Sequence, residues 1–86
     1  MFQFQAIQTG QATITGTASQ IVPQYSSRSG LTIVNTGSNT VYIGEAAVTS
    51  ATGYPLLASA SVSFSTTGAV FGVSSGGSTV GWLQTN

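Results

Sequence analysis

Only two side chains of this 86-residue chain carry a full charge at neutral pH, Arg28 and Glu45. The sequence contains no histidine and no cysteine. General acid–base catalysis needs groups that titrate near the working pH, usually a histidine or a pair of carboxylates. A serine nucleophile needs a neighbouring base, and a metal site needs several histidine, cysteine or carboxylate ligands. The residue types therefore predict a protein that is not an enzyme and that holds no metal or other cofactor.

The two charged residues lie just outside the ends of the segment 30–44. They could pair within one chain, although an exposed ion pair contributes only about 0–1 kcal/mol. Alternatively, each could contact a neighbouring subunit, since arginine is enriched at the energetic centres of protein interfaces. One arginine cannot neutralise a phosphate backbone, so nucleic acid is not an expected partner. No apolar run approaches the roughly 20 residues of a membrane span, so a membrane is not expected either.

The low charge density is the most unusual property of the composition. Charged residues make up 2% of the chain, against about 25% in typical soluble domains. Disorder is not expected, because 41% of the residues are hydrophobic and the net charge is zero. A single domain of this size buries roughly 60% of its unfolded surface and is marginally stable alone. With no cysteine to cross-link it, the chain is expected to cover much of its surface by assembly with other protein.

The segment 30–44 gives the clearest structural signal, because two runs rich in β-branched residues flank the turn-forming sequence Asn-Thr-Gly-Ser-Asn. It predicts a β-hairpin in which Asn35 opposes Val41 and Ile33 opposes Ile43. This register places Leu31, Ile33, Val41 and Ile43 toward the core. It places Thr32, Val34 and Tyr42 on the outer face.

Short alternating segments separated by glycine-rich turns continue along the rest of the chain. Strands are expected within 2–8, 11–15, 18–23, 59–65, 69–73 and 78–84, and no segment has helical periodicity. The segment 45–57 is predicted to cross one end of the domain, with Leu56 in the core. The whole chain, residues 1–86, is thus expected to be one all-β domain. Its predicted architecture is a small antiparallel β-sandwich or jelly-roll-like barrel of about eight short strands.

Aromatic residues supply the remaining candidates for binding. Phe2 and Phe4 alternate with glutamines. They are expected to lie either on a first core strand or on an N-terminal arm, formed by residues 1–9, that is exchanged with a neighbouring subunit. Tyr42 and Tyr54 are expected to be accessible, and such rings suit protein contacts or sugar stacking. Trp82 is interpreted as a core residue rather than a ligand platform. The interface candidates are therefore Phe2, Phe4, Arg28, Val34, Tyr42, Glu45 and Tyr54.

The run from Arg28 to Trp82 resembles small all-β structural proteins of tailed-bacteriophage virions. The segments that carry the resemblance are 28–37, 41–44, 48–50, 53–56, 68–73 and 77–80. The resemblance implies a capsid decoration or cement protein on the outer capsid surface, synthesised in the host cytoplasm. It implies a homo-oligomer, with a trimer favoured, and the major capsid protein as partner.

Two other functions remain open at this stage. One is a carbohydrate-binding or adhesin-like module of a phage tail or fibre, which the tyrosines favour. The other is a self-assembling fibre or pilus-like subunit, which the unguarded strand edges would permit.

Overall fold

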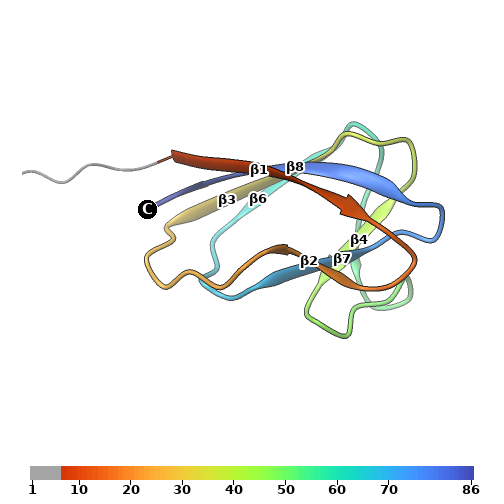
Figure 1. Ribbon diagram of the computed structural model, residues 1–86, viewed down its shortest axis with the longest axis horizontal. Helices are drawn as coiled ribbons and strands as arrows, with labels where there is room; N and C mark the ends of the chain where they lie inside the picture. The colour runs from red at the N-terminus through yellow and green to blue at the C-terminus, as the bar shows by residue number, and fades with distance from the viewer. Residues whose placement is uncertain (1–6) are drawn as a thin grey trace, which may run out of the picture.

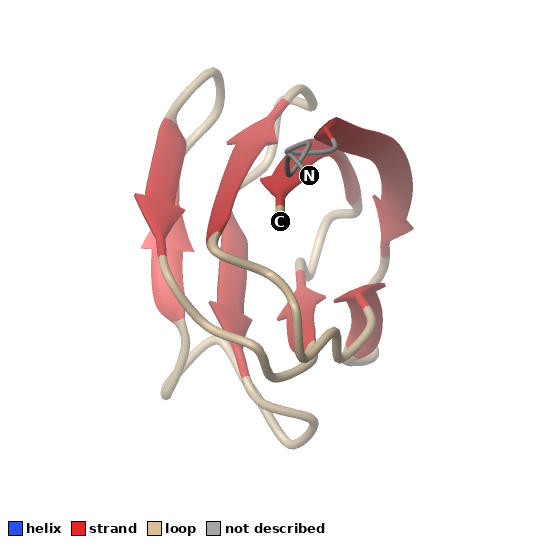
Figure 2. Cartoon of the chain, turned by 90° about the vertical axis from the view of Figure 1, so that its left-hand side faces the viewer, coloured by secondary structure: helices blue, strands red, loops and turns tan. Residues whose placement is uncertain are grey.

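The structure of the protein is a computed structural model that describes residues 7–86. In that range the chain forms eight β-strands and no α-helix. Figure 2 shows the strands in red and the connections between them in tan. The strands are β1 (Ile7–Ile14), β2 (Ser19–Val22), β3 (Gly30–Asn35), β4 (Val41–Gly44), β5 (Tyr54–Leu56), β6 (Ser61–Phe64), β7 (Val70–Val73) and β8 (Ser78–Thr85).

The strands form two antiparallel sheets that pack face to face as a β-sandwich (Figure 1). The first sheet has the order β1-β8-β3-β6, and the second sheet has the order β2-β7-β4-β5. The pairing is nested: β1 pairs with β8, β2 with β7, β3 with β6 and β4 with β5. This strand order is that of a jelly roll, so the predicted fold class is confirmed.

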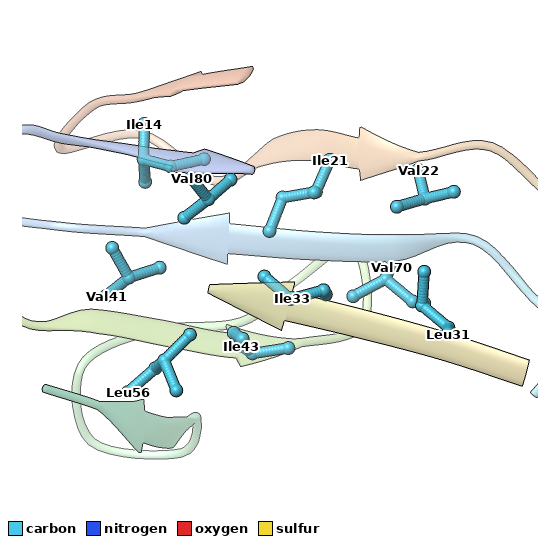
Figure 3. Close-up of a cluster of buried hydrophobic side chains, with 10 residues drawn as sticks. All are labelled: Ile14, Ile21, Val22, Leu31, Ile33, Val41, Ile43, Leu56, Val70 and Val80. Carbon is cyan, nitrogen blue, oxygen red and sulfur yellow. The ribbon is translucent and has the colours of Figure 1, made fainter. Parts of the chain in front are cut away.

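The core lies between the two sheets and consists almost entirely of aliphatic side chains. Figure 3 shows these side chains pointing toward one another from strands of both sheets. In most strands they come from alternate positions, as expected when one face of a sheet is buried. In β2 the consecutive residues Ile21 and Val22 are both buried, at an irregularity in its pairing with β7. The buried cluster is Ile14, Ile21, Val22, Leu31, Ile33, Val41, Ile43, Leu56, Val70 and Val80. Trp82 is partly buried and packs against this cluster, which agrees with its interpretation as a core residue.

The segment 30–44 is not a hairpin, and the predicted register is wrong. β3 belongs to the first sheet and β4 to the second, so Ile33 lies opposite Val62 and Trp82 rather than Ile43. Val41 pairs with Leu56. The inward positions were nevertheless predicted correctly, because alternation within each strand does not depend on the partner strand. Leu31, Ile33, Val41 and Ile43 are all buried.

Asn35, which is fully buried, organises the connection between β3 and β4. Its Nδ2 donates to the carbonyl oxygens of Asn39, at 2.8 Å, and Leu56, at 2.9 Å. Its Oδ1 accepts from the backbone N–H of Gly37, at 3.0 Å, and from the hydroxyl of Ser78, at 2.8 Å. A buried amide with every bond satisfied is favourable, whereas losing one partner is costly. Asn35 therefore fixes the crossing of the chain from one sheet to the other.

The segment 45–53 lies over the outer face of the second sheet rather than across one end of the sandwich. Val48 is 6% exposed although it is outside the core cluster. It packs beside two glycines: a Cβ atom on Gly44 or Gly53 would lie within 2.8 Å of its Cγ2 atom. Leu56, which follows this segment, is in the core as predicted.

Within the described residues β1 spans Ile7–Ile14, so it includes the end of the predicted strand 2–8 and most of the predicted strand 11–15. Residues 7–9 pair with β8 of their own chain, Ile7 with Thr85 and Thr9 with Leu83. Of the segment 1–9, predicted as a strand or an exchanged arm, residues 7–9 thus belong to a strand of their own chain. Residues 1–6 lie outside the described part of the chain.

We predict that Asn35→Asp lowers the free energy of unfolding by about 2–5 kcal/mol, because the carbonyl oxygens of Asn39 and Leu56 lose their donor and then lie against another hydrogen-bond acceptor. Asn39→Asp is the matched control, since Asn39 is exposed; we expect a cost below about 1 kcal/mol. Urea denaturation of both variants measures the difference. Equal stability of the two variants would contradict the role of Asn35.

Candidate interaction surfaces

Arg28 is 5% exposed, and its guanidinium is used within its own chain. Nε donates to Oε1 of Gln84 at 2.8 Å. Nη1 donates to the carbonyl oxygens of Thr66, at 2.9 Å, and Gly68, at 3.0 Å. Nη2 donates to the carbonyl oxygen of Pro23. The rigid fork of donors of an arginine can serve several oxygens at once, which a lysine cannot do.

These hydrogen bonds connect segments that are far apart in the sequence. They join the β2–β3 connection, which holds Arg28 itself, to the β6–β7 connection and to β8. Gln84 in turn donates from Nε2 to Oε1 of Gln8 in β1. Arg28 is thus a structural cross-link at one end of the sandwich.

This finding corrects both interpretations of Arg28, which were an ion pair with Glu45 and a contact with a neighbouring subunit. Within the described residues its guanidinium bonds to a glutamine side chain and to backbone carbonyls and not to Glu45, and its burial leaves little of it for a neighbouring subunit. Glu45 is exposed at the end of β4. The folded chain therefore presents one charged side chain to solvent.

The outer face of the first sheet is largely exposed. We call it the open face and define it by its non-hydroxyl residues Ile7, Gln11, Val34, Gly81 and Leu83. Ile7 is 66% exposed and Leu83 is 40% exposed. Gly81 lies in register between Gln11 and Val34, so the missing side chain leaves a shallow hollow of about 240 Å³ in the middle of the face. No charged residue lies on any of the four strands of this sheet.

Hydroxyl groups on the open face bond to each other across the strands. The hydroxyl of Thr32 lies 2.8 Å from that of Ser63, and the hydroxyl of Thr36 lies 2.9 Å from that of Thr79. Each pair satisfies part of its own hydrogen-bonding capacity. Desolvation of the open face by a flat partner consequently costs less than desolvation of isolated hydroxyls.

Val34 and Tyr42 do not form the single patch that the hairpin prediction implied. Val34 is half-buried on the open face, whereas Tyr42 points outward from the second sheet. Tyr42 lies beside the covering segment, where a Cβ atom on Gly53 would come within 2.7 Å of the Tyr42 Cβ atom. Of these two candidates, Val34 alone belongs to the open face.

Tyr54 lies at a second feature, an apolar pocket between the two sheets. It is 59% exposed in β5 and pairs with Ile43 of β4. The pocket has a volume of about 300 Å³ and is lined by Ile43, Tyr54, Val62 and Phe64, with no polar lining. We call it the seam pocket, because β5 and β6 are the edge strands of their sheets.

Sequence reasoning missed the contributions of Ile7 and Leu83 to the open face and of Val62 and Phe64 to the seam pocket. Leu83 carried a usable signal, since it is an apolar residue out of phase with Val80 and Trp82 in the same strand. Val62 and Phe64 alternate with serines within the predicted strand 59–65, but their position at an edge follows only from the strand order. The candidates Phe2 and Phe4 lie outside the described residues.

No group of three or more histidine, cysteine, aspartate or glutamate side chains occurs among residues 7–86. Over the same range, the structure contains no helix that could span a membrane.

Comparisons with protein-family models, with curated proteins and with solved structures gave no match to this chain.

We predict that Arg28→Met lowers the free energy of unfolding by at least about 3 kcal/mol, because several buried oxygens lose a charged donor. Glu45→Gln, which removes the other charge, should change it by less than about 0.5 kcal/mol. Urea denaturation in the same buffer tests both. A loss of stability in Glu45→Gln as large as that in Arg28→Met would indicate that the two charges act as a pair.

Proposed function

We propose that this chain is a non-enzymatic structural protein of a bacteriophage virion. It decorates the outer capsid surface as a homo-oligomer, with a trimer favoured, and clamps neighbouring capsid subunits. The observation that carries the proposal is the open face, a sheet surface without charge that exposes Ile7 and Leu83. Exposed apolar side chains on an uncharged face favour contact with protein over free solution.

The distribution of surfaces supports the same proposal. The segment 45–53 covers part of the outer face of the second sheet, and Val48 anchors it there. The first sheet has no comparable covering segment within residues 7–86. One face is thus partly covered by the chain itself, and the other is available to a partner. We assign the open face to the capsid shell.

Jelly rolls occur in both viral capsid proteins and lectins, so the fold alone does not decide between the two functions. Tyr54 is an exposed ring that could stack on a sugar. The seam pocket below it, however, has no polar lining. A sugar hydroxyl that entered it would lose its hydrogen bonds to water without replacement. The seam pocket therefore favours an apolar occupant, and a glycan array that reports binding lost in Tyr54→Ala would favour the lectin function.

We predict that the purified chain co-sediments with shells assembled from the major capsid protein encoded in the same genome. Gln11→Glu and Leu83→Glu should each weaken this binding at least tenfold, because each places an unpaired carboxylate in the water-excluding interface between the open face and the shell.

Gln20→Glu is the matched control for Gln11→Glu. Gln20 is also an exposed strand residue, but it belongs to β2 in the second sheet. Shell binding by this variant should equal that of the natural chain. Absence of co-sedimentation at micromolar concentration, or equal weakening by Gln11→Glu and Gln20→Glu, would contradict the proposal.

A further inference from the structure

The seam pocket has the properties of a binding site for an apolar side chain. Its volume of about 300 Å³ lies at the lower end of the range for ligand pockets. Ile43 and Tyr54 form one wall, and Val62 and Phe64 form the other. All four side chains offer carbon surface, and neither charged residue is among them. An occupant that is hydrophobic and uncharged would gain most from this pocket.

The pocket is bordered by strand edges that can accept a further strand. β5 and β6 each have a hydrogen-bonded neighbour on one side only. Pro55 lies in β5 and cannot donate a backbone hydrogen bond. β6, with the sequence Ser-Val-Ser-Phe, contains neither a proline nor a charge that would block an added strand. β6 is consequently the more accessible edge for β-strand addition.

The chain itself contains a segment that matches this edge. Residues 2–5 read Phe-Gln-Phe-Gln, so both phenylalanines would lie on one face of a strand and both glutamines on the other. This alternation matches that of β6, in which Val62 and Phe64 face the seam pocket. Neither the segment nor β6 carries a charged side chain.

We propose that residues 1–6 of a second copy of this chain add a strand to the edge of β6 and insert Phe2 and Phe4 into the seam pocket. This inference rests on the homo-oligomer of the proposed function and names its contact. The open face stays free for the shell, because the seam pocket lies between the sheets.

Covalent geometry favours a second copy over the chain's own N-terminal segment. β1 and β6 are the opposite edges of the first sheet, separated by three strand spacings, or roughly 14 Å. The backbone from Ile7 to Phe4 spans at most about 11 Å when fully extended. Phe4 cannot therefore reach the edge of its own β6 and run along it as a strand.

Cysteine cross-linking tests the contact directly, because the natural chain contains no cysteine. Phe4→Cys chains and Tyr54→Cys chains, carrying tags of different mass, are mixed and oxidised. We expect a disulfide-linked heterodimer. Replacing Tyr54→Cys with Ser38→Cys, an exposed residue of the β3–β4 connection, should abolish it.

Two outcomes would overturn the inference. One is a heterodimer yield that does not exceed that of the Ser38→Cys control. The other is a doubly substituted Phe4→Cys/Tyr54→Cys chain that cross-links only within the monomer, which would mean that the chain's own segment occupies the pocket.

Light scattering supplies an independent measurement on the full-length chain. Phe2→Ala/Phe4→Ala should raise the dissociation constant of the oligomer more than about a hundredfold, since two aromatic rings lose their buried contact. Gln3→Ala/Gln5→Ala changes the other face of the same segment and should leave it within threefold. Unchanged association of the phenylalanine variant would overturn the inference.

The two proposals fail separately in these experiments. Shell binding by the natural chain together with a negative cross-linking result would overturn the N-terminal exchange and leave the virion function intact. A heterodimer without shell binding would overturn the virion function and leave the N-terminal exchange intact.

Discussion

The hydrogen bonds of Arg28 determine both the closure of the sandwich and the character of its surface. They connect the β2–β3 connection, the β6–β7 connection and β8 at one end of the sandwich. Because they draw the only basic side chain inward, Glu45 is left as the one charged side chain in contact with solvent. The interaction that stabilises this end of the fold thus removes from the surface a charge that would otherwise oppose dry contact with other protein.

The jelly-roll strand order explains where the remaining surfaces lie. Apart from β4 and β5, consecutive strands alternate between the two sheets, so nearly every pairing joins distant parts of the sequence. The nested order leaves β6 and β5 as neighbouring edges, and the seam pocket lies between them. The segment 45–53 covers part of the outer face of the second sheet, whereas the outer face of the first sheet is largely exposed. In our account, the open face contacts the shell and the seam pocket contacts a second copy.

Several features of the fold could be predicted from the sequence because they depend on local alternation. The all-β class, the inward positions of Leu31 and Ile33 and the burial of Leu56 are of this kind. The partners of each strand could not be predicted. The turn-forming sequence after Asn35 suits a hairpin and a crossing between sheets equally well. The hydrogen bonds of the buried Asn35 side chain to Leu56 and Ser78 select the crossing. The burial of Arg28 could not be predicted either, because it also depends on contacts between distant segments. Its acceptors are mostly backbone carbonyl oxygens, which carry no sequence signature.

The central claim is that this chain, which carries only two charged side chains, exists as an assembly rather than as a free monomer. The most direct test is the molar mass of the purified full-length chain, measured by light scattering over a range of micromolar concentrations. The account predicts a discrete multiple of the 8.7 kDa chain mass, with a trimer favoured. A stable monomer at every concentration in that range would contradict it.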